Sequence, residues 1–265
     1  MDNLHIFILS VLQGLTEFLP ISSSAHLVLL PKLLHWPDQG LVFDVAVHIG
    51  SLIAVIFYFR EEVWRMLNAW MRNVAGGEAD RDSLLAWWVI VGTLPVIFFG
   101  WLVDGEIETM LRQPWIIAAA SIGFGLLLWF TDMTGRRERD EFDLRLKDVL
   151  AIGFSQVLAL IPGTSRSGIT ITMGLMLGLS RRASARFSFL LAMPVILASG
   201  VLQSLHMFAE VRPIAWSDLM LGALLSAISA GLCIHFFLRL VERVGMLPFV
   251  IYRVLLGVLI FALVY

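Results

Sequence analysis

The sequence predicts an all-α polytopic membrane protein built as an inverted-topology repeat. Three observations lead to this fold class: the apolar composition, two polar stretches at matching places in the two halves, and basic residues grouped in alternate connections. Of the 265 residues, 58% are hydrophobic and only 15% are charged, whereas soluble domains carry about 25% charged residues. Such a chain belongs in a bilayer, where helices satisfy their own backbone hydrogen bonds.

Six segments are long and apolar enough to cross the membrane, because about 20 helical residues span the hydrocarbon. They cover residues 41–59, 83–103, 115–133, 187–209, 217–239 and 249–265. Two further regions, 4–34 and 148–179, are apolar but are interrupted midway by proline and hydroxyl residues. Their arms are too short to span, so each is predicted to form a re-entrant helical hairpin. Irregular backbone at that depth is tolerated where protein or water covers it.

The basic residues support this layout, because short cytoplasmic loops carry an excess of Lys and Arg. Fourteen of the 19 Lys and Arg residues fall in four connections, namely 60–82, 134–147, 180–186 and 239–248. All four can be cytoplasmic only if the two hairpins do not cross. The first hairpin then enters from the outside and the second from the cytoplasm.

The resulting order is a hairpin plus three spans, repeated once. We expect a first repeat over residues 1–133, a cytoplasmic linker over 134–147 and an inverted second repeat over 148–265. The odd number of crossings turns the second half upside down, an arrangement common in transporters. Pro20 and Pro162 mark the two hairpin tips, which can meet near the middle of the membrane.

The first tip carries ionisable residues that are costly in hydrocarbon unless they pair or face a wet cavity, which makes them functional candidates. Gln13 and Glu17 share one helix face at i, i+4 spacing. Ser22, Ser23 and Ser24 are strong N-cap types for a second helix. The free backbone N–H groups of that helix would form an anion site, with His26 in its first turns. Capping alone, and a core histidine bonded to a carbonyl, are the structural alternatives.

The second tip, residues 162–168, again gives a turn followed by a helix start. Gly163 permits close approach of the backbone to a ligand, and Arg166 offers a planar fork suited to phosphate or carboxylate. Further hydroxyl groups belong to Thr164, Ser165, Ser167 and Thr170. The structural alternatives are an ion pair between Arg166 and Glu17, and a hydroxyl of Thr170 bonded to its own helix.

Together these groups favour an anion with many oxygens, and phosphate fits best. Glu17 and Gln13 could hold a divalent cation such as Mg²⁺ or Ca²⁺, since Mg²⁺ uses one or two carboxylates plus substrate oxygens. Arg253, near the start of the last span, is expected to extend its charge to the cytoplasmic side instead.

The same residues carry a family resemblance. The stretch from Gln13 to His26 closely resembles the glutamate-rich motif of the undecaprenyl-diphosphate phosphatase family. Residues 162–170 resemble that family's second motif, Pro-Gly-x-Ser-Arg-Ser-x-x-Thr, and residues 43–55 resemble its third stretch. The motif order and the span layout fit over the whole chain.

Three positions depart from the family pattern. Gln13 stands where Glu is frequent, which weakens a two-carboxylate metal site. Ser24-Ala25 stands where Thr-Gly or Ser-Gly is usual, and His48 stands where Gln is usual.

The resemblance implies hydrolysis of undecaprenyl diphosphate to the monophosphate, which recycles the bacterial cell-wall carrier lipid and confers bacitracin resistance. It also implies a multi-pass protein of the bacterial inner membrane whose site opens to the extracytoplasmic side. The expected partners are the polyprenyl diphosphate lipid and the bilayer, with no nucleic acid, and a homodimer is the assembly considered.

Roles for the residues follow from their chemistry. The expected phosphate-binding residues are Ser22, Ser24, Gly163, Thr164, Ser165, Arg166, Ser167 and Thr170, and the expected catalytic residues are Glu17, Ser23, His26 and Arg166. His26 is the candidate nucleophile or general acid/base, and Ser23 is the alternative nucleophile with His26 as its base. Glu17 would bind metal or orient water. A phosphohistidine, a phosphoserine and direct attack by water all stay open.

A transporter is the rival interpretation, either a flippase for the lipid monophosphate or an anion carrier. Opposed hairpins that meet at the midplane suit alternating access as well as catalysis. A purely structural scaffold is disfavoured, because it leaves the cost of the buried polar residues unexplained.

Overall fold

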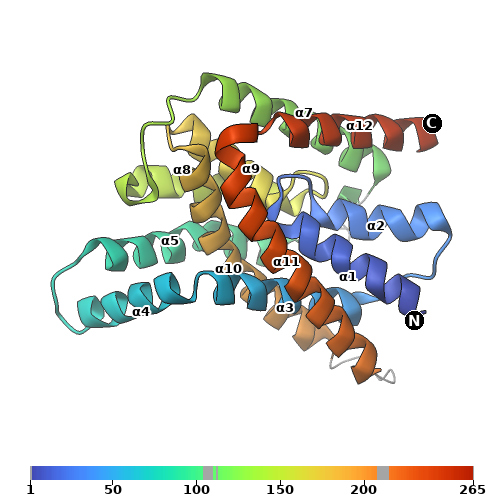
Figure 1. Ribbon diagram of the computed structural model, residues 1–265, viewed down its shortest axis with the longest axis horizontal. Coiled ribbons are helices and arrows are strands. Elements are labelled where there is room, and N and C mark those ends of the chain that lie inside the picture. The colour runs from blue at the N-terminus through green and yellow to red at the C-terminus, as the bar shows by residue number, and fades with distance from the viewer. Residues whose placement is uncertain (1, 104–109, 112, 208–214, 265) are drawn as a thin grey trace.

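The computed structural model describes residues 2–103, 110–111, 113–207 and 215–264 (Figure 1). Within these ranges the chain forms 11 α-helices and two short 3-10 helices. The last two residues of the predicted span 187–209, and Tyr265 at the end of the last span, lie outside the described residues. The all-helical prediction is confirmed.

The first half contains a helical hairpin, a long helix continued by an amphipathic one, and two further long helices. These are α1 (Asn3–Phe18), α2 (Ser23–Leu34), α3 (Leu41–Tyr58), α4 (Arg60–Val74), α5 (Arg81–Leu102) and α7 (Pro114–Thr134). The second half begins with another hairpin, whose first arm ends in a 3-10 turn over Leu158–Leu160. Its helices are α8 (Leu146–Val157), α9 (Arg166–Met176), α10 (Arg181–Met207), α11 (Trp216–Val244) and α12 (Leu247–Val264).

Five of these helices are long and apolar enough to cross a membrane, and they match five of the six predicted spans: α3, α5, α7, α10 and α11. The sixth predicted span corresponds to α12, which is apolar but shorter by the same measure, over Leu247–Leu263. Helices α1, α2, α8 and α9 have only 16, 12, 12 and 11 residues. They are too short to span about 30 Å of hydrocarbon individually, as the hairpin interpretation requires.

Small residues bring the helices of the two halves into close contact. A Cβ atom added to Gly14 of α1 would collide with the backbone of Ser226 on α11, and one added to Gly50 of α3 would collide with Ala223. Within a bilayer the hydrophobic effect does not drive helices together. Close approach of the backbones at small residues instead provides van der Waals packing between the helices. Helix α11 therefore crosses both α1 and α3 closely (Figure 1).

The largest hydrophobic core anchors the end of the first hairpin arm. Phe18, the last residue of α1, is fully buried and meets Phe189 of α10 edge to face, with ring centroids 5.2 Å apart. Phe189 packs in turn on Phe237 of α11. Aromatic pairs of this geometry fix ring positions well, so the first tip starts from a rigid base.

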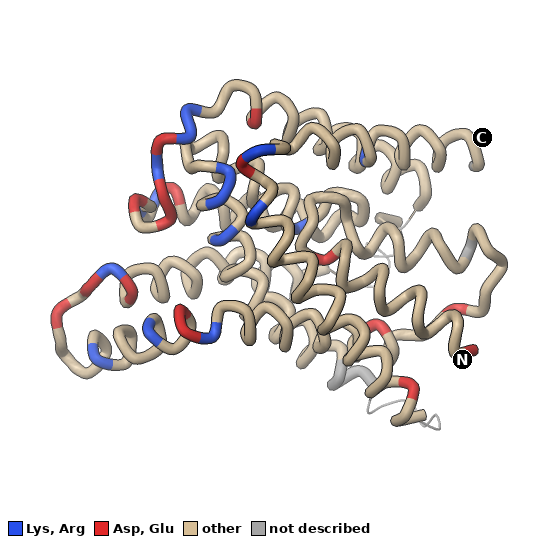
Figure 2. Tube along the Cα trace, viewed as in Figure 1, with Lys and Arg blue, Asp and Glu red and all other residues tan. Residues whose placement is uncertain are grey.

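Charged residues gather at one end of the molecule. Figure 2 shows most Lys and Arg residues at the end opposite the two termini, where the connections α3–α4–α5, α7–α8 and α9–α10 lie. Buried ion pairs join these connections, including Arg181 with Asp132 at 2.6 Å and Arg186 with Glu62 at 2.8 Å. Burial raises the pKa of the Glu62 carboxyl above its usual range, although the Arg186 guanidinium acts in the opposite direction. We refer to this region as the basic end.

Candidate active site

The tips of the two hairpins touch each other. The Ser167 hydroxyl at the start of α9 donates a hydrogen bond of 2.8 Å to the carbonyl of Leu19, which follows α1. The Arg166 guanidinium lies 3.3 Å from a carboxylate oxygen of Glu17. Residues about 150 positions apart in the sequence are thereby brought into one buried polar cluster, which we call the tip cluster.

The same backbone device starts the second helix of each hairpin. Ser22 precedes α2 with φ of 71°, and Ser165 precedes α9 with φ of 69°. Positive φ is uncommon for residues other than glycine, and such strained positions gather at functional sites. The Ser165 hydroxyl also accepts from the Gly168 N–H at 3.1 Å and so caps α9. In both tips the chain turns sharply into a helix, and the start of α9 contacts the first hairpin through Ser167.

Glu17 stands at the centre of the tip cluster and is almost fully buried. Its carboxylate accepts from Gln13 at 2.9 Å, from Ser23 at 2.6 Å and from Arg166 at 3.3 Å. The Nε2 atom of His48 lies 3.7 Å away. Four helices, α1, α2, α3 and α9, thus supply groups to one carboxylate, and its charge is already balanced by Arg166.

His26 is held in one tautomer. Its Nδ1 atom lies 2.7 Å from the Ser22 carbonyl, which can only accept, so Nδ1 carries the proton. Its Nε2 atom bonds to the hydroxyl of Tyr252 on α12, and the two rings stack with centroids 5.5 Å apart. With Nδ1 protonated, Nε2 is the ring nitrogen that faces the Tyr252 hydroxyl. The Ser23 hydroxyl donates to Glu17 rather than to His26.

The remaining hydroxyls surround the two helix starts. Ser22 and Ser24 lie 3.3 Å apart, and Ser165 and Ser167 lie 3.2 Å apart, oxygen to oxygen. Thr170 donates within its own helix and to Ser188 of α10, at 2.7 Å from the latter hydroxyl.

Four buried polar atoms of the two hairpins have no hydrogen-bond partner among the described residues. They are the hydroxyls of Ser10 and Thr164 and the Oε1 atoms of Gln13 and Gln156. Unsatisfied buried polar groups are rare and call for an explanation, such as a bound ligand or ion.

No group of three or more His, Cys, Asp and Glu residues in the described ranges is arranged to hold a metal ion. The donor set at the tips is smaller and consists of one carboxylate, Glu17, and the free amide oxygen of Gln13. A Mg²⁺-like cation at these two oxygens would take most of its ligands from substrate and water, and it would share Glu17 with Arg166.

Arg253 contradicts the prediction from the sequence. It was expected to extend to the cytoplasmic side, but its side chain is fully buried and donates to the carbonyls of Pro20, Gly163 and Thr164. The physical reason is that the irregular tips leave carbonyl groups without helical partners, and a guanidinium offers five N–H donors.

Three residues of this region were not assigned to the site from the sequence: His48, Tyr252 and Ser188. His48 lay in the stretch that resembles the family's third motif, which was a usable signal. Tyr252 and Ser188 come from helices without motif character, and only the fold brings them to His26 and Thr170.

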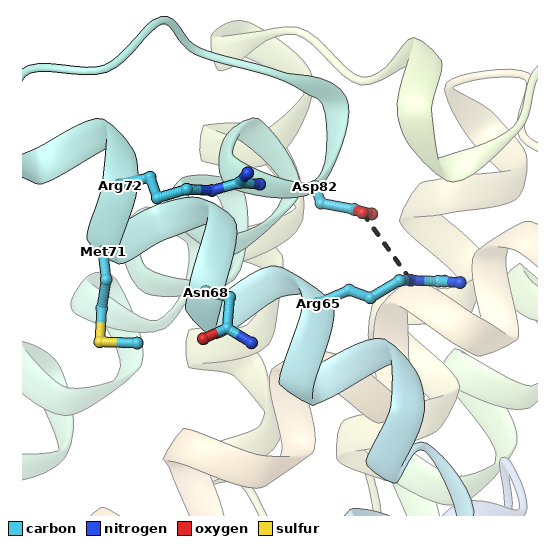
Figure 3. A pocket seen from close by; sticks show the side chains of 5 residues that line it. All are labelled: Arg65, Asn68, Met71, Arg72 and Asp82. Carbon is cyan, nitrogen blue, oxygen red and sulfur yellow. Dashed lines mark ion pairs between the residues drawn. The ribbon is translucent and has the colours of Figure 1, made fainter.

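The surface hollows lie elsewhere. Figure 3 shows one between α4 and the start of α5, lined by Arg65, Asn68, Met71, Arg72 and Asp82. Its ion pair, Arg65 with Asp82 at 3.8 Å, is largely exposed, and such pairs contribute little to stability. Neither this hollow nor the one beside Arg136 and Arg145 is lined by a residue of the tip cluster.

The fold and the tip cluster define a polytopic membrane protein with a buried polar site between two helical hairpins. The family described as "Bacitracin resistance protein BacA" matches residues 6–259. The chain therefore belongs to the BacA family.

The curated relatives agree with this assignment. Undecaprenyl-diphosphatase 2 of Stutzerimonas stutzeri is 56% identical, with 99% of this chain and 98% of that protein covered. Undecaprenyl-diphosphatase of Nitrosococcus oceani is 55% identical, with 99% of both chains covered. The enzyme of the same name from Chromohalobacter salexigens is 54% identical over 98% of each chain.

Proposed function

We propose that the chain hydrolyses undecaprenyl diphosphate to undecaprenyl phosphate and inorganic phosphate at the tip cluster. Relatives named undecaprenyl-diphosphatase cover nearly the whole chain at more than half identity. The observation that carries the site assignment is the convergence of two helix N-termini, each started by a serine with positive φ, on Glu17 and Arg166. Helix N-termini are ready-made sites for phosphate.

In this proposal the prenyl tail stays among the spans while the diphosphate reaches the tips. Arg166, the hydroxyls of Ser165 and Ser167, and the amides near Ser22–Ser24 hold the terminal phosphoryl group. Phosphoryl transfer depends mostly on positioning and charge neutralisation. The free hydroxyl of Thr164 offers one more polar contact.

His26 is the candidate for the chemical step, because its neutral imidazole presents Nε2. Once the Tyr252 hydroxyl leaves, Nε2 either attacks the terminal phosphorus, breaking the anhydride bond and releasing undecaprenyl phosphate, or takes a proton from an attacking water. In the first route water then cleaves the P–N bond. Ser23 is the alternative nucleophile. Its hydroxyl donates a hydrogen bond of 2.6 Å to Glu17, which would orient the Ser23 oxygen.

A divalent cation, Mg²⁺ or Ca²⁺, held by Glu17 and the free oxygen of Gln13, is part of this proposal. When bound, it would shield the negative charge of the diphosphate oxygens. The unpartnered Oε1 atom of Gln13 supports it.

We also propose the inverted repeat, with boundaries at 1–133, 134–147 and 148–265, and a site open to the extracytoplasmic side. The matching serines at the two tips and the grouping of basic residues at one end support it. In a Cys233→Ser background, a cysteine at Asp38 should react with an impermeant reagent from outside, and one at Arg139 should not. Labelling of both from outside would contradict the topology. A homodimer stays a prediction, to be checked by light scattering in detergent.

Phosphate release by detergent-purified protein tests the function directly, because chemistry needs no second compartment whereas transport does. We expect release of one phosphate per undecaprenyl diphosphate, abolished by Arg166→Ala. Failure of the folded protein to release phosphate, together with movement of lipid monophosphate across vesicle membranes, would favour the flippase instead.

A further inference from the structure

Arg253 is a fully buried cation whose guanidinium donates, among the described residues, only to carbonyl groups. Its donors lie 2.8 to 3.4 Å from their acceptors. The acceptor oxygens belong to Pro20, Ala120, Ser121, Gly163 and Thr164. A charged side chain inside a membrane protein is expensive and is a functional candidate by default.

These bonds join both hairpins to α7 and α12. Pro20 belongs to the first tip, Gly163 and Thr164 belong to the second, and Ser121 lies on α7. A peptide group is planar with its N–H opposite its C=O. Because the Thr164 carbonyl is held by Arg253 at 2.8 Å, the N–H of the same peptide, which belongs to Ser165, must point away from Arg253. The guanidinium thereby fixes how the N-terminal turn of α9 presents its donors.

The first turn of α9 lies directly against this guanidinium. A Cβ atom added to Gly168 would lie 2.7 Å from the Nη1 atom of Arg253. The charge of Arg253 therefore sits immediately behind the helix N-terminus, and adds to the positive potential there.

The charge of Arg253 is not balanced within the described part of the chain. No described carboxylate pairs with it, and Glu17, the acid of the tip cluster, pairs with Arg166. Two guanidiniums thus accompany one carboxylate in a buried region. An uncompensated buried charge is costly, and a bound phosphate would offset that cost.

We propose that Arg253 is a positioning residue for phosphoryl transfer. Its hydrogen bonds fix the position of one tip relative to the other. Its positive charge would be balanced by the phosphate of the substrate. The inference rests on the proposed function of the tip cluster as the phosphate site.

Two substitutions separate geometry from charge. Arg253→Lys keeps the charge but loses the planar set of five N–H donors. Because the two tips would then be misplaced, kcat should fall about 10- to 100-fold. Inhibition by inorganic phosphate should stay within about threefold of the wild type, because the charge persists. Arg253→Met loses both, so kcat should fall further and the inhibition constant of phosphate should rise about tenfold or more. Arg181→Met, at the basic end, is the control: its melting temperature should fall while both constants stay unchanged.

A second pair of variants perturbs Arg253 without replacing it. A Cβ atom added to Gly125 of α7 would lie 3.2 Å from the Cβ of Arg253, whereas one added to Gly123 would meet nothing within 4 Å. Gly125→Ala should lower kcat relative to Gly123→Ala, at equal expression and similar melting temperature. If Arg253→Met does not fold, the comparison of Gly125→Ala with Gly123→Ala tests whether Arg253 is a positioning residue.

Normal kcat per folded enzyme in Arg253→Lys and Gly125→Ala, or unchanged phosphate inhibition in folded Arg253→Met, would overturn the inference. The failure of the proposed function looks different, because full turnover of Arg166→Ala would remove the tip cluster as the site. An inactive Arg166→Ala beside normal Arg253 variants would remove only the role of Arg253.

Discussion

Arginines with buried partners occur in two regions of this molecule, and those partners differ. At the basic end, Arg181 meets Asp132, Arg186 meets Glu62, and each pair lies within 3 Å. At the tips, Arg166 meets Glu17 at a longer 3.3 Å, and Arg253 meets carbonyls alone.

This difference separates arginines that stabilise the fold through carboxylate partners from Arg253, which has no carboxylate partner among the described residues. A buried pair whose charges match satisfies itself, and removing one partner leaves the other uncompensated. At the basic end Arg181 meets one carboxylate and Arg186 meets two, those of Glu62 and Glu141, so both guanidiniums have carboxylate partners. These pairs tie α10 to α7 and α4. The tips carry more positive than negative charge among the described residues, as the proposed binding of a phosphate requires.

The largest expected effect comes from the guanidinium at the tips. Arg166→Lys keeps a positive charge but loses the planar fork, so kcat should fall about 10²- to 10³-fold, or about 3–4 kcal/mol in the barrier, as for loss of one preorganised donor. Phosphate release by the purified variant measures it. Near-normal turnover in folded protein would reduce Arg166 to a structural partner of Glu17.

The matching change at the basic end should act on stability instead. Asp132→Ala removes the partner of Arg181 and the acceptor for the N–H of Met246. Breaking a buried pair costs about 3–5 kcal/mol, so thermal unfolding in detergent should shift down strongly. Turnover per folded molecule should not change. A loss of kcat as large as that of Arg166→Lys would erase the distinction between the two regions.

The chemical step is tested by trapping the intermediate. A terminal-phosphate-labelled substrate, quenched rapidly, should label the wild type with a phosphohistidine, which is acid-labile and survives base. His26→Ala should abolish the label. An acid-stable label lost in Ser23→Ala but kept in His26→Ala would transfer the nucleophilic role to Ser23. Full single-turnover activity without any label would favour direct attack by water.

A smaller effect is expected at the partner of His26. Tyr252→Phe removes the hydroxyl bonded to Nε2 but keeps the stacked ring. A hydrogen bond is worth about 1 kcal/mol, so kcat should change about fivefold while the melting temperature stays within a few degrees. A loss of more than about 100-fold would indicate that the Tyr252 hydroxyl acts on substrate directly.

The smallest effect is expected at His48, whose Nε2 atom lies 3.7 Å from Glu17 and is not in hydrogen-bond contact. His48→Gln installs the residue usual in the family and should leave kcat within about threefold, because no hydrogen bond to Glu17 is lost at 3.7 Å. A loss of kcat of more than about 100-fold would instead assign His48 a direct part in the reaction.

Much of the fold could be predicted from the sequence, because membrane-spanning helices can be recognised by their length and apolar composition. Five predicted spans reappear as α3, α5, α7, α10 and α11. The hairpins were recognisable because Pro20 and Pro162 interrupt apolar runs that are flanked by hydroxyls.

The tip cluster was predictable only where its residues lie in motifs. Glu17, His26 and Arg166 are ionisable residues within apolar segments, and their cost there marks them. Arg253 is also an ionisable residue within an apolar segment, but its position near the start of the last predicted span equally allowed a location at the membrane interface. Only the fold, which places α12 against α7 and behind both tips, decides between the two. Tyr252 and Ser188 carried no signal, because single polar residues on apolar helices are common.

The account rests on the claim that the excess positive charge at the tips binds phosphate. Isothermal titration of inorganic phosphate into the detergent-solubilised protein tests it most directly. We expect one phosphate per chain, with affinity retained in Asp132→Ala and weakened at least about tenfold in Arg166→Ala. Equal affinity in the wild type and in both variants would show that phosphate binds elsewhere, and would contradict the assignment of the tip cluster.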